Sequence, residues 1–375
     1  MAKYDRLVNT IISGSMKGAA GKVICIDAAA GADELVREIA AEIARRGGVP
    51  CVNRRDRPRS FDPCNDGGNF INHATEKQFA RKVRQEDAIL KTYDGHIRIY
   101  CDEDLFFGQD IDQARMQAWR KMFMPVWHKR VLDARPWVLL YFPSAARAVQ
   151  AGMSLKQYTD FWHKVSSMDY SAMDAAMEPL KRRMEKADVV RIVAKNGTDL
   201  TFSIKGRRAV KCSAQCNIPD GEVFTAPIRN TIDGVVQFNT DLEYAGIPYK
   251  NIRLKFQKGR VVEARSEINN DKLCKLLDGD AGARYAGEFA LGVNPYITRC
   301  FKDVLFDEKI GGSFHIALGN CHKEAPNGNK SQIHFDMIQI QTPEYGGGEI
   351  WFDGELIRKD GKFVLGELKG LDRLK

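Results

Sequence analysis

Apolar positions in the first half of the chain recur with two different periods. Short apolar runs at residues 23–26 and 137–142 have the length of strands. Longer segments repeat their apolar positions with the period of a helix, and the first of them ends at a Gly-Gly pair, as helices commonly do. These helical segments place Leu35, Ile39 and Ile43 on one stripe and include residues 104–133 and 155–186. The pattern predicts a mixed α/β fold here.

The pattern changes beyond residue 188. From there short strands alternate with turns that contain glycine, beginning with a hairpin at Asn196-Gly197. The later strands are predicted within residues 231–239, 252–267, 313–319, 331–341 and 349–365, and helices at about 268–278 and 296–305. We therefore predict two domains, an N-terminal α/β domain over residues 1–188 and a strand-rich α+β domain over residues 189–375.

The charge balance gives little sign of a nucleic-acid partner. The 375 residues carry 57 Lys and Arg against 49 Asp and Glu, a formal charge of +8, and 44% of them are hydrophobic, as in an ordinary folded protein. The one local basic run is interrupted by Asp56 and is followed by no aromatic platform. This run consists of Arg54, Arg55, Arg57 and Arg59. We predict a solvated basic loop and no nucleic-acid binding.

Several other classes of protein are disfavoured. No apolar stretch approaches the roughly 18 residues of a membrane helix, and the first ten residues lack a secretory pattern, so we predict a cytoplasmic protein without a membrane partner. The closest of the nine cysteines, Cys212 and Cys216, lack the second pair of a four-ligand zinc site. The AAAGAD turn after the first strand lacks the glycine spacing of a dinucleotide site.

Histidines gather in a short part of the second half. His315, His322 and His334 lie within 20 residues, although the chain has only seven histidines. Because strand side chains alternate, His334 and Asp336 share one face of their strand. His315 shares a face with small residues, which leaves space around its ring. Imidazole and carboxylate are the usual ligands of a catalytic divalent metal, although a surface pair and a core histidine remain alternatives.

Three glutamates add to this group. Glu222 follows an Asp-Gly turn, and Glu288 lies in an apolar, glycine-flanked segment that contains no other acid. A carboxylate buried in such surroundings must be paired, metal-bound or neutral. Glu308 stands between Asp307 and Lys309, for which a solvated charge cluster is the alternative.

Four motifs in order give these residues a family context. They read IPDGEVFTAP, GEFALGVNP, LFDEKIGGSFHIALG and NGNKSQIHFDMI. From about residue 137 to 336 the chain resembles the thermophilic metallo-aminopeptidase family, of the aminopeptidase T and aminopeptidase S type. The resemblance implies a two-domain architecture, α/β plus α+β, with a metal-binding C-terminal domain, a homodimer, and an N-terminal domain that restricts access or dimerises.

The resemblance also implies a role for each candidate residue. Glu308 takes the position of the family's catalytic glutamate. His322 stands seven residues after His315, where the family commonly has a tyrosine. We expect His322 to donate a hydrogen bond to the tetrahedral oxyanion, with metal ligation as the alternative. The implied metal ligands are Glu222, Glu288, His315, His334 and Asp336.

The resulting functional hypothesis is a metal-dependent aminopeptidase. It removes N-terminal residues from peptides with a free N-terminus, using a water activated by two divalent ions, which could be zinc, cobalt, manganese or magnesium. One alternative, favoured by His322 at the tyrosine position, is a metal-binding hydrolase of the same fold with another amide substrate or reduced activity. The other is a basic binding protein without enzymatic activity.

Overall fold

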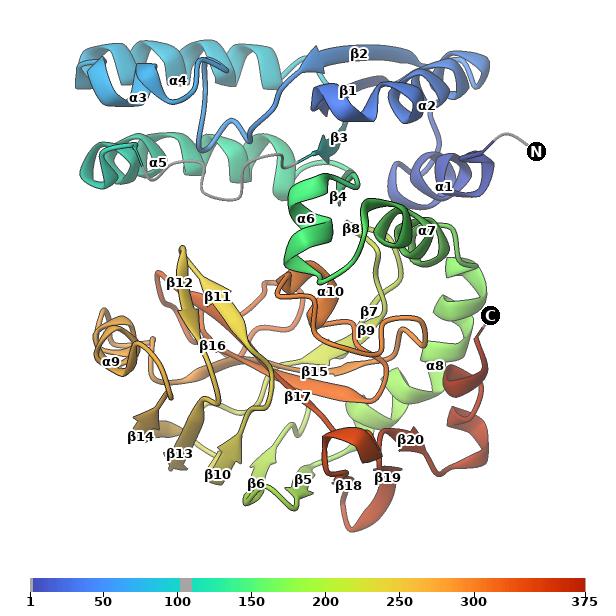
Figure 1. Cartoon of the computed structure of the whole chain (residues 1–375), viewed down its shortest axis with the longest axis vertical. Helices are drawn as coiled ribbons and strands as arrows, with labels where there is room; N and C mark the ends of the chain where they lie inside the picture. Colours follow the sequence, from blue (N-terminus) through green and yellow to red (C-terminus); the bar gives the residue numbers. More distant parts are fainter. Residues whose placement is uncertain (1–2, 102–109, 375) are drawn as a thin grey trace. The chain divides into compact units, whose positions relative to one another are not determined.

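Residues 3–101 and 110–374 are described by the computed structural model (Figure 1). They form two units. The first unit runs to Met168 and also includes Ala214–Pro219, and the second consists of Asp169–Ser213 and Asp220–Lys375. None of the helices in these ranges is both long enough and apolar enough to cross a bilayer. The roles predicted for residues 1–188 and 189–375 stay predictions.

The first unit is built on a parallel sheet with helices packed around it. The strand order is β2-β1-β3-β4-β8, and every neighbouring pair is parallel. The strands are β1 (Val23–Ala28), β2 (Val49–Arg54), β3 (Gly95–Tyr100), β4 (Trp137–Tyr141) and β8 (Asn217–Ile218). The helices include α1 (Asp5–Asn9), α2 (Asp33–Arg45), α3 (Asn69–His73), α4 (Glu76–Leu90), α5 (Gln113–Trp127), α6 (Ala145–Gln150) and α7 (Leu155–Ser166). The strands predicted at residues 23–26 and 137–142 are confirmed.

Two predicted helical segments have different bounds in the structure. Of the segment 104–133, residues 104–109 lie outside the described residues, and α5 with a following π-helical turn covers 113–132. The segment 155–186 is two helices, α7 and α8 (Tyr170–Lys186). The second begins where the Asp169 carboxylate accepts a hydrogen bond from the Ala172 N–H, which caps its first turn.

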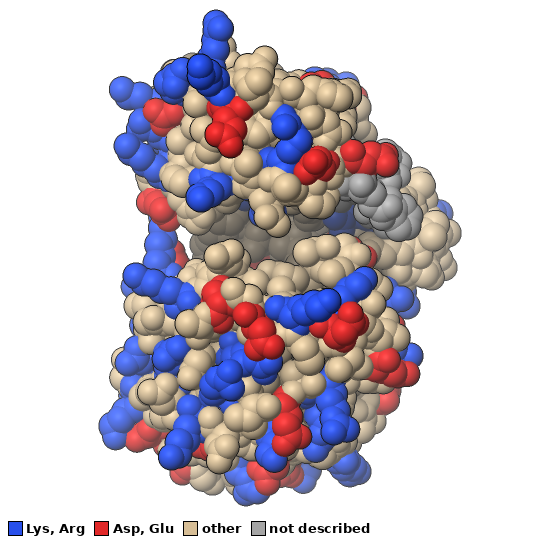
Figure 2. Space-filling model, turned by 90° about the vertical axis from the view of Figure 1, so that its left-hand side faces the viewer, with Lys and Arg blue, Asp and Glu red and all other residues tan. Residues whose placement is uncertain are grey.

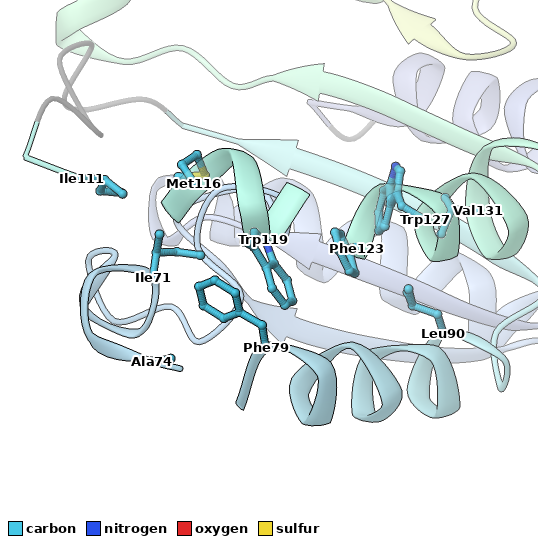
Figure 3. Close-up of a cluster of buried hydrophobic side chains, with 10 residues drawn as sticks. All are labelled: Ile71, Ala74, Phe79, Leu90, Ile111, Met116, Trp119, Phe123, Trp127 and Val131. Carbon is cyan, nitrogen blue, oxygen red and sulfur yellow. The ribbon is translucent and has the colours of Figure 1, made fainter. Parts of the chain in front are cut away.

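Helices α3, α4 and α5 enclose an aromatic core (Figure 3). Trp119 stacks on Phe123 with ring centroids 5.0 Å apart, and Phe79 meets Trp119 at 5.8 Å with an interplanar angle of 66°. Offset and edge-to-face pairs of this kind add to the stabilisation from burial. The amphipathic character of α4 and α5 is explained by this shared core.

A buried ion cluster lies beside the sheet. Arg59 is only 3% exposed, so the predicted solvated basic loop is wrong at this residue. Its guanidinium donates to both carboxylate oxygens of Asp27, at 2.9 and 3.0 Å, and pairs with Glu86. His96 Nε2 lies 2.9 Å from Asp27 Oδ2. Arg59 is buried because the buried carboxylates of Asp27 and Glu86 need a cation beside them.

The second unit contains two antiparallel sheets. The smaller sheet has the order β17-β16-β15-β9-β7. Its strands are β7 (Val210–Cys212), β9 (Glu222–Thr225), β15 (Ala286–Gly292), β16 (Ser313–Gly319) and β17 (His334–Ile340). Figure 1 shows β15, β16 and β17 running across the unit above the strands of the larger sheet. Phe202 of the larger sheet contacts Phe289 of β15, with ring centroids 4.9 Å apart. The two sheets thus share a core.

The larger sheet surrounds that core and has the order β14-β13-β10-β6-β5-β18-β19-β20. Its strands are β5 (Val189–Ala194), β6 (Thr198–Ser203), β10 (Asp233–Gln237), β13 (Arg253–Gln257), β14 (Arg260–Arg265), β18 (Glu349–Phe352), β19 (Glu355–Lys359) and β20 (Lys362–Phe363). A separate hairpin, β11 (Leu242–Tyr244) and β12 (Ile247–Tyr249), and helix α9 (Asn270–Leu277) complete the unit. Arg358 is fully buried and donates hydrogen bonds to the carbonyl oxygens of Gly292 and Ser313, which ties β19 to the smaller sheet.

The helix predicted at residues 296–305 is mostly wrong. The structure has only the short helix α10 (Val304–Asp307). Asp307 gives the physical reason, because its buried carboxylate accepts hydrogen bonds from the N–H groups of Phe301 and Asp303. These bonds hold the preceding segment in a turn that leads into the helix.

Charge is distributed rather than gathered on the face drawn in Figure 2. Lys and Arg side chains are interspersed there with Asp and Glu. The net charge of +8 therefore does not form a single basic field on that face. The expected lack of a nucleic-acid partner stays a prediction.

Replacing Arg59 tests the buried ion cluster. We expect Arg59→Met to lower the free energy of unfolding by about 3–5 kcal/mol, because it leaves Asp27 and Glu86 buried without their cation. Arg54→Met is the matched control: Arg54 pairs with Asp33 at the surface, and its loss should cost less than about 1 kcal/mol. Denaturant unfolding of both variants measures the difference, and equal losses would contradict the account.

The same cluster makes a prediction about pH. Burial acts to raise the pKa of Asp27, but the contacts with His96 and the guanidinium of Arg59 outweigh it and hold this pKa well below its ordinary value. The resulting stabilisation is complete above the unfolded pKa of about 3.9 and is lost as the pH falls through the lower folded value. The deficit of Arg59→Met relative to the wild type should therefore shrink below about pH 4 in the same unfolding measurements. A deficit that stays constant down to the acid limit would argue against this cause.

Candidate metal centre

Four neighbouring strands of the smaller sheet position the predicted ligands. Glu222 begins β9, Glu288 lies in β15, His315 in β16, and His334 and Asp336 in β17. Each of them pairs with a small residue on a neighbouring strand. The pairs are Glu222 with Gly292, His315 with Ala290, Glu288 and Asp336 with Ala317, and His334 with Gly319. Small partners leave the space above the strands to the acidic and imidazole groups. The structure therefore brings all five residues to one face of one sheet.

Glu288 lies at the centre of this group. Its Oε1 is 3.5 Å from Nε2 of His315. Its Oε2 is 3.2 Å from Nε2 of His334 and 3.0 Å from Nε2 of His322. The two oxygens of one carboxylate therefore face two different sets of imidazoles.

The remaining carboxylates surround His315 and His334. Glu222 Oε2 and Asp336 Oδ1 lie 3.6 and 3.9 Å from Nε2 of His315. The same Asp336 oxygen is 3.4 Å from Nε2 of His334. His334 Nδ1 is 2.8 Å from the carbonyl oxygen of Asn320, which fixes Nε2 as the nitrogen that faces the cluster.

Glu308 joins the cluster through a residue that sequence reasoning missed. Lys309 is only 1% exposed, and its Nζ lies 2.6 Å from Glu308 Oε1 and 2.6 Å from Glu222 Oε1. Asp307 is buried as well, so the solvated charge cluster proposed as the alternative for Glu308 is wrong. No sequence signal singled out Lys309, because its neighbours Asp307 and Glu308 made it resemble a solvated surface charge.

Burial and crowding shift the proton affinities of these groups. Burial raises the pKa of Glu308 to about 8, with the positive charge of Lys309 opposing the shift. Burial acts to lower the pKa of His315, but the surrounding carboxylates outweigh it and raise the pKa to about 9. Both shifts favour the protonated form, for Glu308 chiefly because of burial and for His315 because of the surrounding carboxylates.

The donor atoms fit a divalent cation. Among the residues that the structure describes, several buried site atoms lack a hydrogen-bond partner, namely Glu222 Oε2, both ring nitrogens of His315, and Asp336 Oδ1. Unpaired buried polar atoms are costly, and a cation among them removes that cost. Four groups of candidate ligand atoms can be defined here, with every atom of a group within 4.8 Å of the others: Glu222, Glu288 and His315; Glu288, His322 and His334; Glu308, His315 and Asp336; and Cys212, Asp220 and Glu222.

Comparison with known sequences points to one family. Residues 1–363 match the family described as thermophilic metalloprotease (M29), which extends the predicted resemblance over the N-terminal part and confirms it. The chain is 36% identical over 183 residues to aminopeptidase T from Thermus thermophilus and 33% identical over 158 residues to aminopeptidase AmpS from Bacillus subtilis. These matches cover 42% and 38% of this chain, and 44% and 38% of the relatives. The chain thus aligns with less than half the length of the relatives.

Comparison with solved structures confirms the predicted fold class. Wild-type AmpT from Thermus thermophilus has a similar fold with a TM-score of 0.77 at 20% identity, covering 97% of this chain and 99% of that chain. A 2,5-dihydroxypyridine dioxygenase from Pseudomonas putida has a TM-score of 0.60 at 11% identity, covering 98% and 99%. At these identities the likeness concerns the fold alone, and the second match shows that proteins named for different chemistry share it.

Metal binding should stabilise the protein through this cluster. We expect zinc added to chelator-treated protein to raise the midpoint of thermal unfolding, by about 2.7 kcal/mol in unfolding free energy at a free concentration of 100 times Kd. Glu288→Gln should remove most of this gain, because its carboxylate faces both sets of imidazoles. The control is Glu263→Gln, whose partner Lys255 lies at the surface. An equal gain in both variants would place the metal elsewhere.

Proposed function

This chain belongs to the thermophilic metalloprotease (M29) family, and from that premise we propose that it is a metal-dependent aminopeptidase that removes N-terminal residues from peptides. The proposal depends on one observation above all. Acidic and imidazole groups from four strands converge on one buried cluster with unpaired donor atoms. The groups proposed as metal ligands are Glu222, Glu288, His315, His334 and Asp336.

We propose that the cluster would hold two divalent ions, to each of which Glu288 would offer one carboxylate oxygen. This proposal is supported by the direction of the two carboxylate oxygens of Glu288, because one faces His315 and the other faces His334. Three carboxylates among the ligands balance most of the charge of two divalent ions. Zinc, cobalt, manganese and magnesium are all compatible with mixed oxygen and nitrogen ligands, so their identity depends on affinity and supply.

The bound ions supply two kinds of chemistry, a lowered pKa of water and polarisation of the scissile carbonyl. The protein provides the proton transfers. In the proposed reaction Glu308 accepts the proton of the attacking water and delivers it to the leaving amine. Lys309, 2.6 Å from Glu308 Oε1, holds that carboxylate in position and leaves its second oxygen for the proton. The same ammonium holds Glu222 Oε1, so that Glu222 Oε2 remains free to bind a cation.

The surroundings of the enzyme are also part of the proposal. We propose a homodimer, as the family resemblance implies, and a cytoplasmic location, as predicted from the sequence. The proposed substrates are peptides with a free N-terminus. Size measurement in solution tests the dimer.

Replacing Glu308 tests the proposed base. Glu308→Gln keeps the shape and the contact with Lys309 but removes the acceptor, so kcat should fall by about 10²–10⁴ while the metal content stays unchanged. Glu324→Gln, at an exposed position, is the control and should keep wild-type kcat. Metal analysis by mass spectrometry accompanies the kinetics. Full activity of Glu308→Gln at unchanged metal content would refute this role.

A substrate panel tests the reaction class. Chelator-treated protein, reloaded with single metals, should cleave amino-acid arylamides that have a free amine and leave their N-blocked counterparts intact. Activity should vanish on chelation and return with metal. Cleavage of the blocked compounds would favour the alternative of a hydrolase with another amide substrate.

A further inference from the structure

His322 is held by two aromatic contacts at the edge of the cluster. It lies in the segment that follows β16, and its ring is 4.7 Å from that of His334 and 5.2 Å from that of Phe224, measured between centroids. The side chain is 46% exposed, so burial alone does not force it to find a polar partner. The ring of His322 nevertheless points toward the cluster.

The direction of its ring is the key observation. His322 Nε2 lies 3.0 Å from Glu288 Oε2, the same oxygen that His334 Nε2 approaches at 3.2 Å. The two imidazole nitrogens and the carboxylate oxygen are three donor atoms that could bind one cation. These three atoms lie within 4.8 Å of one another. Because Nδ1 of His334 is engaged with Asn320, the two Nε2 atoms are the ones positioned for a shared cation.

From this geometry we infer that His322 is a third imidazole ligand of the metal centre, on the side of Glu288 occupied by His334. The inference deepens the proposed function, because it assumes that this cluster binds metal. It also replaces the expectation that His322 donates to an oxyanion. A donor for that role should face the scissile carbonyl of the substrate, whereas His322 Nε2 faces the carboxylate of Glu288.

The third imidazole makes the two metal positions chemically different. On one side of Glu288 the ligands are His322 and His334, with Asp336 close by. On the other side His315 is the single imidazole among carboxylates. Imidazole suits zinc and cobalt, whereas carboxylate suits magnesium and manganese. The position with two imidazoles should therefore select zinc or cobalt, and the position rich in oxygen should accept a wider range.

Metal titration of variants tests this assignment. We compare the chelator-treated wild type with His322→Ala and His322→Gln, using a chromophoric chelator in competition for zinc or manganese. One zinc-binding step should weaken in both variants by at least about 10–100-fold, the loss seen when even an outer partner of a ligand is removed. Manganese binding should change by less than about 3-fold. The control His73→Ala removes an exposed histidine of the other unit and should leave both metals unaffected.

A spectroscopic measurement tests ligation directly. In the cobalt-loaded protein each coordinated imidazole gives a strongly shifted N–H resonance, so both His322 variants should lose one such signal and His73→Ala none. Circular dichroism of the metal-free variants checks that they fold, and His322→Gln serves if His322→Ala does not. Zinc affinities and shifted resonances that match the wild type in His322→Gln would overturn the inference.

The two proposals fail in different ways. Wild-type protein that binds zinc but cleaves no peptide refutes the proposed function, and the inference is then judged on the zinc affinities alone. Cleavage of peptides together with unchanged zinc affinity in the His322 variants refutes the inference and leaves the function standing. Wild-type protein that binds no zinc overturns both.

Discussion

Mutual repulsion between buried carboxylates is the constraint on which the second unit depends. Glu222, Glu288 and Asp336 share a small space, with Glu308 beside them. Lys309 contacts two of these groups, Glu222 and Glu308, through one oxygen of each. Glu222 Oε2 and Asp336 Oδ1 face imidazoles but have no hydrogen-bond partner. Burying these carboxylates without a cation costs free energy, and binding positive ions among them removes that cost.

The sheet meets this constraint through its register. Each ligand stands opposite a glycine or an alanine, and Ala317 lies between Glu288 and Asp336 on the middle strand. Antiparallel pairing places such neighbours about 5 Å apart, close enough for carboxylates and imidazoles to converge on shared atoms. The shared core around Phe202 and Phe289 keeps these strands in place. The five proposed ligands thus lie on strands, whereas Glu308 and His322 lie in connecting segments.

Much of this arrangement could be predicted because strand periodicity is local. Alternation alone placed His334 beside Asp336, and the isolated acid in an apolar segment singled out Glu288. Long-range pairing was the part that local patterns could not reach. Lys309 and Arg59 both resembled surface charges in their sequence neighbourhoods, yet each is buried by carboxylates that are distant in the chain, Glu222 and Asp27.

The direction in which side chains point also could not be predicted from the sequence. The spacing from His315 marked His322 as a departure from the family, but it contained no information about where the ring nitrogens point. For the same reason, the sequence could not predict that the two carboxylate oxygens of Glu288 face different imidazoles. The helix expected at 296–305 failed because a carboxylate of Asp307 bonds the backbone of the preceding turn, which is a tertiary effect.

Anomalous X-ray diffraction at the zinc edge tests the central claim most directly. Crystals of the full chain grown with zinc should show two anomalous peaks in this cluster, about 3.5–4 Å apart and on opposite sides of Glu288. Zinc found only outside the cluster, or a cluster without anomalous density at saturating metal, would contradict the account.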